Sequence, residues 1–122
     1  MGKSDLAIER AQRAVRLSPY DPLNVRPYCG LAIAFFHAKR YGEAEQAARR
    51  ASEFNPGFSV PYALRAAALI RLGRPNDAKA AAQQVVALQP TFTIRGFATT
   101  TALEPEVFAP FAAAWRDAEL PQ

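Results

Sequence analysis

The only histidine and the only cysteine of this 122-residue chain, His37 and Cys29, are the side chains whose types most often do chemistry. A histidine serves as a general base when it has a partner side chain and a cleft, and a cysteine serves as a nucleophile in a basic, partly exposed setting. His37 follows the aromatic pair Phe35-Phe36, and Cys29 stands beside Gly30, so the sequence shows neither setting. We expect His37 at a helix surface or groove edge, Cys29 as a small packed residue, and no catalytic site in the chain.

The sequence also offers no ligand set for a metal or a cofactor. One cysteine and one histidine cannot form a protein metal site by themselves. The glycines at positions 42, 57, 73 and 96 stand singly at helix junctions or in the tail, not in a phosphate-binding cluster. A single cysteine excludes a disulfide within the chain. We therefore predict no cofactor and no metal site.

The composition of the chain is that of an ordinary globular protein. We expect the chain to lie in the cytoplasm. Half of the residues are hydrophobic, and the net charge is only +4, from 15 Lys and Arg against 11 Asp and Glu. The basic residues alternate with Glu along the expected helices, whereas a nucleic-acid binder would more often gather them on one stripe. No run of about 18 apolar residues could span a membrane, and the N-terminus lacks the apolar core of a secretory signal. We expect neither nucleic acid nor a membrane as a partner.

The elements that must position these side chains belong to an internal repeat. Six pairs of identical or similar residues lie 34 positions apart. These pairs are Pro27 and Pro61, Tyr28 and Tyr62, Phe35 and Leu69, Ala44 and Ala78, Ala48 and Ala82, and Pro56 and Pro90. A repeat of this length indicates a helix–turn–helix unit that stacks on its neighbours. The sequence predicts an all-α fold, a right-handed α-solenoid of antiparallel helix pairs with about seven helices.

Prolines, glycines and capping residues divide the chain into expected helices at 4–17, 25–39, 41–54, 60–72, 75–88 and 106–118. We assign 1–22 to the second helix of an incomplete repeat plus a loop, 23–57 and 58–90 to full repeats, and 91–122 to C-terminal capping helices, all in a single domain. The first helix has the alanine and proline spacing of a repeat's second helix. We therefore expect the chain to be a C-terminal piece of a longer protein.

Three residues in these helices carry specific expectations. Glu45 should face outward and form an i, i+4 pair with Arg49 that adds little stability. Ser59 should cap the helix that begins at Val60. Pro110 comes late for a first turn, so it should kink its helix or split off a short turn.

The repeat resembles the tetratricopeptide repeat. In that family the first helix carries an aromatic residue, then Leu-Gly or Leu-Ala, then another aromatic residue, and the second helix carries spaced alanines followed by proline. The matching residues of the first unit are Tyr28, Leu31, Ala32, Phe35, Tyr41, Ala44, Ala48, Ala51 and Pro56. The second unit departs from the pattern at Arg65, where the family normally has a core leucine. Arg65 must therefore extend outward or find a partner.

The resemblance implies a groove, because the first helices of successive repeats in this family line a concave face that binds partner segments. Carried over to this sequence, the groove positions are Arg26, Cys29, Gly30, Ile33, Phe36 and His37 in one repeat and Val60, Ala63, Leu64, Ala67, Ile70 and Arg71 in the next. This set is mostly apolar, so we do not expect the clamp with which some members hold a C-terminal carboxylate. The groove is either open to an amphipathic helix or to a second copy of the chain, or covered by the chain's own C-terminal aromatic helix or by upstream repeats.

A narrower resemblance concerns the run from Ala14 to Pro22 and the tail from Ala118 to Pro121. Both look like the C-terminal repeat region of bacterial class III adenylate or guanylate cyclases. This implies a non-catalytic interaction scaffold that regulates or oligomerises a bacterial signalling protein, whose cyclase residues would lie outside this chain. Two alternatives stay open, a stand-alone peptide-binding adaptor and the repeat region of a winged-helix transcriptional regulator. The expected partner is a protein or peptide segment, or a second copy of the chain in a homodimer.

Overall fold

The computed structural model describes residues 6, 8–10, 12–13, 25–100 and 103–122 of the chain, apart from the side chains at positions 25, 26 and 100. The expected helix at 4–17 and the loop after it therefore lie largely outside the described residues. Of the residues described there, Ile8 is buried and belongs to the hydrophobic core.

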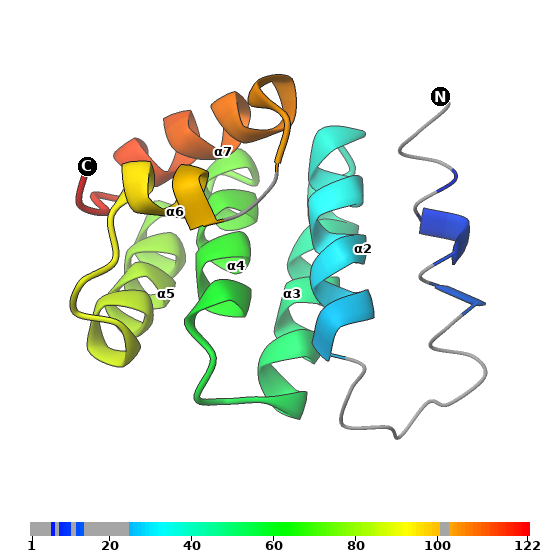
Figure 1. Cartoon of the computed structure of the whole chain (residues 1–122), viewed down its shortest axis with the longest axis horizontal. Coiled ribbons are helices and arrows are strands. Elements are labelled where there is room, and N and C mark those ends of the chain that lie inside the picture. The colour runs from blue at the N-terminus through cyan, green and yellow to red at the C-terminus, as the bar shows by residue number, and fades with distance from the viewer. Residues whose placement is uncertain (1–5, 7, 11, 14–24, 101–102) are drawn as a thin grey trace.

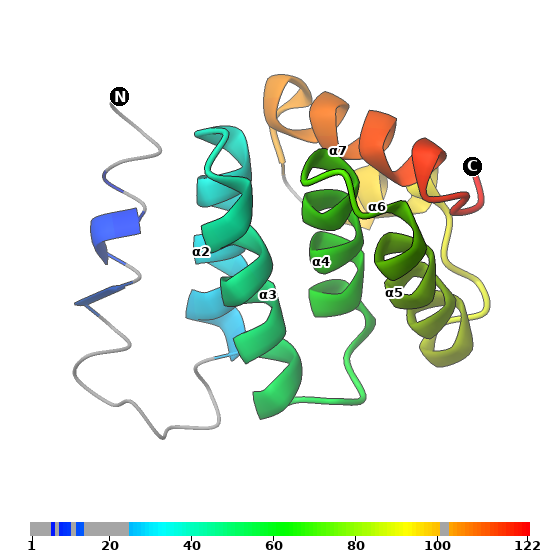
Figure 2. The ribbon, with the colours of Figure 1, turned by 180° about the vertical axis from the view of Figure 1, so that it is seen from behind.

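Two helix pairs and two C-terminal helices follow residue 24. The first pair is α2 (Val25–His37) and α3 (Tyr41–Phe54), the second pair is α4 (Ser59–Arg71) and α5 (Pro75–Leu88), and α6 (Ile94–Thr100) and α7 (Pro105–Asp117) come last. Figure 1 shows α2 and α4 toward one face, and Figure 2 shows α3 and α5 on the opposite face. All regular structure within the described ranges is helical, which confirms the predicted all-α fold of stacked helix pairs.

The two helix pairs turn in the same way, one period apart. Lys39 (φ 64°) and Gly73 (φ 74°) both have left-handed backbone just after the first helix of their pair. In the first turn the Arg40 N–H donates to Phe35 O at 2.8 Å, and the second turn repeats this bond one period later at 2.9 Å. This is the Schellman arrangement, which satisfies the last carbonyls of a helix and favours glycine at the left-handed position. Glycine occupies that position in the second turn, whereas Lys39 bears the strain of an L side chain in the first.

Small residues let the second helix of each pair pack closely on the first. The inward-facing alanines of α3 and α5 are at most 6% exposed; they are Ala44, Ala47, Ala48, Ala51, Ala78, Ala81 and Ala82. Alanine combines the best helix propensity with a small side chain, so these positions favour the helices and permit close approach. Leu64 and Leu69 of α4 supply larger buried side chains to the same core.

The C-terminal helices close the row of pairs with a cluster of aromatic rings. Trp115 and Phe111 of α7 are fully buried, and the Trp115 Nε1–H donates to Ala63 O of α4 at 2.8 Å. Phe92 and Phe97 pack edge-on against the indole of Trp115, with ring centroids 6.0 and 4.7 Å away. A tryptophan contributes most when its ring is buried and its N–H has an acceptor. α7 is thereby fixed on α4, its main neighbour in the fold.

Hydrogen bonds tie the C-terminal tail back to the start of α6. The Ile94 N–H donates to Pro121 O at 2.9 Å, and the Arg95 N–H donates to Gln122 O at 3.2 Å. The first N–H groups of a helix have no acceptor inside the helix, so the tail satisfies two of these groups in α6. None of the helices in the described part of the chain is long and apolar enough to cross a membrane.

Two local expectations can be compared with the structure. α7 is not split at Pro110, which lies inside the helix, so the expected split is wrong and the expected kink stays a prediction. Pro110 and Glu106 are both exposed, so the carbonyl that the proline leaves unbonded belongs to a residue that water can reach. Ser59 is the first residue of α4 and not its cap. Its hydroxyl instead donates to the side-chain oxygen of Gln89 at 2.6 Å and ties the start of α4 to the end of α5.

The expectation that Glu45 faces outward is also wrong. Its side chain is only 6% exposed. The carboxylate accepts hydrogen bonds from Arg49 Nη2 at 2.9 Å on the same helix and from Arg65 Nε at 2.8 Å on α4. Because a buried charge is tolerated only when it is paired and hydrogen-bonded, the two guanidinium groups explain why this carboxylate can lie inside. Of the two outcomes expected for Arg65, it finds a partner.

Candidate functional site

Two rows of side chains on α2 and α4 form the face on which the groove was expected. The α2 row consists of Gly30, Ile33 and His37, and the α4 row consists of Leu64, Ala67 and Arg71. The spacing of three and four residues places each row on one side of its helix, and the two rows correspond at the 34-residue period. The two rows therefore occupy equivalent positions in the two repeats, but they differ in how far the rest of the chain covers them.

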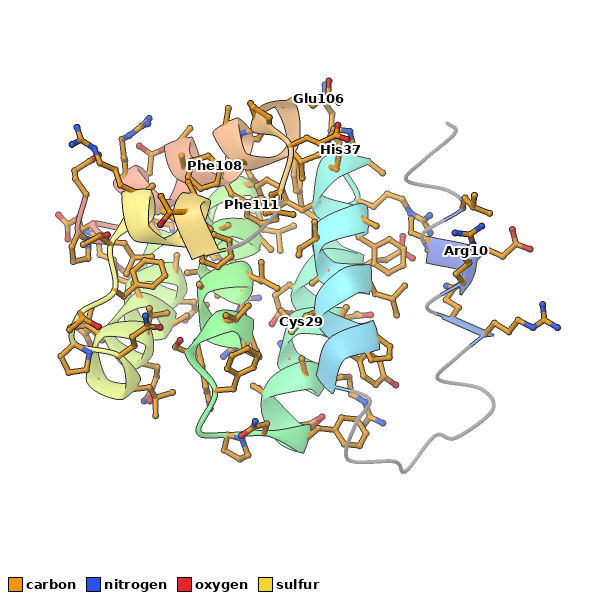
Figure 3. All side chains as sticks on the ribbon, in the orientation of Figure 1. Arg10, Cys29, His37, Glu106, Phe108 and Phe111 are labelled. Atoms are coloured by element: carbon orange, nitrogen blue, oxygen red, sulfur yellow. The ribbon has the colours of Figure 1, made fainter. Side chains whose placement is uncertain are left out.

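The α4 row is largely covered. Leu64 is 1% exposed and Ala67 is fully buried, and α7 packs on this helix through the bond from Trp115 to Ala63. Phe111 of α7 also stacks on Phe36 of α2, with ring centroids 4.0 Å apart and planes 18° from parallel. Figure 3 shows Phe111 between α7 and α2. The sequence left open which segment would cover the groove. In the structure, the chain's own C-terminal aromatic helix, α7, covers the α4 row.

The α2 row stays accessible. Gly30 and His37 are exposed, and Ile33 is half-buried. A Cβ atom placed on Gly30 would have no other atom within 4 Å, so there is room above the backbone at this position. In Figure 3, His37 lies at the end of α2 nearest Glu106, the second residue of α7. The accessible surface is therefore one helix wide, with α7 at one end.

The remaining predicted groove residues differ in exposure. Cys29 and Phe36 are buried, Ile70 is half-buried, and Arg71 is exposed. The side chain of Arg26 lies outside the described residues. Val60 is half-buried and Ala63 is fully buried. That these residues bind a partner stays a prediction, and of the set only those with exposed or half-buried side chains can contact one while α7 is in place.

The chemistry available to the two residues singled out first is limited. Burial raises the pKa of the Cys29 thiol from 9.0 to about 12, because the anion loses its hydration in an apolar setting. A thiol with such a pKa is protonated at neutral pH and is a poor nucleophile. His37 lies in the last turn of α2 and is exposed. Within the described ranges, no three residues of the metal-ligating types come together.

Two features of the structure were not found from the sequence. One is the burial of Glu45 between Arg49 and Arg65. The sequence feature that could have indicated it is the arginine at position 65, where the repeat pattern has a leucine. The other is the identity of the residues through which α7 contacts α2 and α4. The spacing of Phe111 and Trp115 indicated an apolar face on the last helix, but their partners, Phe36 and Ala63, lie far away along the chain.

Comparison with known protein families identifies the repeat. Models of the tetratricopeptide repeat match residues 1–57 and residues 61–92. Together these ranges make up more than half of the chain, and the chain belongs to the tetratricopeptide repeat family. None of the curated proteins compared with the chain matches it.

Solved structures with the same fold include three structures of RPAP3 TPR domains. The first TPR of Spaghetti (RPAP3) bound to the HSP90 peptide SRMEEVD is 23% identical, with a TM-score of 0.68, over 94% of this chain and 79% of that one. The first TPR domain of human RPAP3 is 24% identical, with a TM-score of 0.67, over 97% and 84% of the two chains. The second TPR domain of human RPAP3 in complex with the HSP70 peptide SGPTIEEVD is 23% identical, with a TM-score of 0.68, over 93% and 82%. At these identities the likeness shows the fold alone.

Proposed function

We propose that this chain is a non-catalytic protein–protein interaction scaffold that holds a segment of another protein against the α2 row. The observation that carries the proposal is that α7 covers the α4 row, while the equivalent positions Gly30, Ile33 and His37 stay accessible. Membership of a repeat family of stacked helix pairs supports the proposal, as do the peptides bound to two of the similar structures.

The composition of the α2 row indicates the kind of segment it would hold. Gly30 leaves the helix backbone open to close approach, and Ile33 presents an apolar side chain that is not fully buried. His37 and Arg71 are the polar groups described at the end of the face. Two such groups do not make a clamp for a C-terminal carboxylate, so we favour an amphipathic helix that places an apolar residue on Ile33.

The larger protein to which the chain would belong is also a proposal. The similarity of 14–22 and of the tail 118–121 to the C-terminal repeat region of bacterial nucleotide cyclases supports a regulatory or oligomerising region of a signalling protein in the cytoplasm. The stand-alone adaptor is the second candidate, and the peptide complexes among the similar structures favour it. The reading frame upstream of Asp5 decides between them: a catalytic domain encoded there supports the first, and a start codon with no further domain supports the second.

Photo-cross-linking tests the proposed surface at two matched glycines. Gly30 lies on the α2 row and Gly42 lies on α3, both are exposed, and a Cβ atom at either would meet nothing within 4 Å. We expect a benzophenone amino acid at position 30, introduced into the chain in its native host, to cross-link a partner, and the same residue at position 42 to give no such product. Ile33→Glu should remove the product at position 30 without changing the helical circular dichroism spectrum.

Equal cross-linking from positions 30 and 42, or a product at position 30 that persists in Ile33→Glu, would exclude the α2 row as the docking surface. Phe36 is unsuitable for such a test, although it was expected in the groove. Its ring is 2% exposed and stacks on Phe111, so a charged residue at position 36 would disrupt α7 as well as any binding.

A further inference from the structure

Arg65, which departs from the repeat pattern, pairs with the buried Glu45 carboxylate, and its side chain also lines a cleft. The cleft holds about 330 Å³ between α4 and α5 and is lined by Tyr62, Arg65, Asp77, Ala80, Ala81 and Gln84. Residues 63 and 65 are about 200° apart around a helix. The cleft therefore opens on a different side of α4 from the one where Trp115 of α7 bonds to Ala63.

Arg65 enters the cleft with hydrogen-bonding capacity to spare. Its Nε donates to Glu45 Oε2 at 2.8 Å, and its side chain is 30% exposed. The Nη1 and Nη2 groups have no hydrogen-bond partner in the part of the chain that the structure describes. Glu45 already accepts from Arg49 as well, so the buried carboxylate orients Arg65 without using the outer end of its guanidinium group.

The ion pairs to which the two charged lining residues belong carry a positive excess. Arg65 shares the Glu45 carboxylate with Arg49, and Asp77 pairs with Arg74. Asp77 is the anion that lines the cleft itself, and Arg74 pairs with it through Nε at 2.9 Å and Nη2 at 2.6 Å. Three guanidinium groups against two carboxylates leave one positive charge without a counter-ion. A single negative charge on a ligand would balance it.

We propose that this cleft is a second docking site of the scaffold and accepts an aspartate or glutamate side chain of a partner protein. The carboxylate accepts hydrogen bonds from the Nη groups of Arg65 in the charge-assisted geometry that arginine favours. The Gln84 amide lies within the same lining and supplies a further donor, and Ala80 and Ala81 contact the aliphatic stem of the acidic residue. A phosphate is a poorer fit, because its second negative charge would face Asp77 without compensation.

This site extends the proposed interaction role to a surface that does not include the α2 row, so the two can fail separately. The probe is the amidated peptide acetyl-Ala-Glu-Ala, compared with versions that carry glutamine or phosphoserine in the middle. Binding to the full chain is followed by ¹H–¹⁵N NMR at the Arg65 Nε–H and the Gln84 side-chain amide. We expect saturable shifts at both groups with the glutamate peptide and none with the glutamine peptide.

Two variants separate the charge of Arg65 from the stability of the fold. Arg65→Gln keeps a donor for Glu45 but removes the charge, and we expect it to weaken binding of the glutamate peptide about tenfold, the effect of losing an arginine anchor of about 1.4 kcal/mol. Arg65→Lys keeps the charge and should retain part of the affinity. Arg50→Gln is the matched control, because Arg50 is an exposed arginine of α3 that pairs with Glu53, and it should bind as the unmodified chain does.

Four results would overturn the proposal: no saturable shift with the glutamate peptide, equal shifts with the glutamine peptide, tighter binding of the phosphoserine peptide, or equal losses in Arg65→Gln and Arg50→Gln. Ile33→Glu distinguishes this site from the α2 row. It should bind the glutamate peptide normally, whatever its effect on cross-linking at position 30.

Discussion

Replacing Trp115 by alanine should remove a large part of the stability of the chain. The indole is fully buried among Phe92, Phe97 and Phe111, and truncating a buried aromatic residue to alanine costs about 3–5 kcal/mol. The lost hydrogen bond to Ala63 O adds about 1 kcal/mol at most. We therefore expect a loss of about 3–6 kcal/mol, out of the 5–15 kcal/mol typical of a domain.

The same loss can be stated as a melting temperature. At about 2.1 cal/mol/K per residue, unfolding 122 residues has an entropy of roughly 0.26 kcal/mol/K, so Trp115→Ala should melt about 12–23 °C lower. Urea unfolding followed by far-UV circular dichroism gives the free energy of unfolding directly. Val86→Ala, at a 38% exposed position of α5, is the control and should change stability by no more than about 0.5 kcal/mol. A loss below about 1 kcal/mol in Trp115→Ala would show that α7 does not hold the second repeat as described.

Two further predictions concern backbone strain and the buried thiol. Gly30→Ala should stabilise the chain by about 0.5–1 kcal/mol in urea unfolding, because a Cβ atom there meets nothing within 4 Å. Gly73→Ala should destabilise the chain by about 1–2 kcal/mol, because φ at this position is +74°. A Gly73→Ala variant more stable than Gly30→Ala would refute this prediction. Cys29 should resist a thiol reagent until the chain unfolds. Its pKa is raised from 9.0 to about 12 by burial, so the folded state binds more protons than the unfolded state between these pH values, and stability falls as the pH rises through this window. As the pH rises above about 9, Cys29→Ala should lose less stability than the unmodified chain. If the free energies of unfolding of the two proteins fell in parallel above this pH, the buried thiol would not be the cause of the loss.

The helices and their pairing could be predicted from the sequence because the evidence for them is local. The 34-residue period, the spaced alanines and the breakers gave α3 and α5 with the bounds that the structure has. The turn at Gly73 also carried its own signal, a glycine at the end of an apolar helix. Periodicity of this kind depends only on neighbours within a few turns.

The errors lie where distant residues decide the outcome. The helical pattern groups Glu45 with the exposed charged residues of its own helix. The burial of Glu45 becomes favourable only through its ion pair with Arg65 on the next helix. Ser59 reads as a cap, but the amide of Gln89 competes for its hydroxyl. The unequal covering of the two rows likewise depends on how α7 docks, because α2 and α4 have equivalent positions in the repeat. No local pattern distinguishes them.

The hydrogen bonds between the tail and α6 have a consequence for the order in which the chain folds. A helix of seven residues is too short to be stable by itself, and the acceptors of its first two N–H groups belong to Pro121 and Gln122. α6 can therefore complete its hydrogen bonding only after α7 has docked and brought the tail back beside it. The two helix pairs can form from neighbouring segments, whereas α6, which precedes α7 in the sequence, depends on the docking of α7 for its own stability.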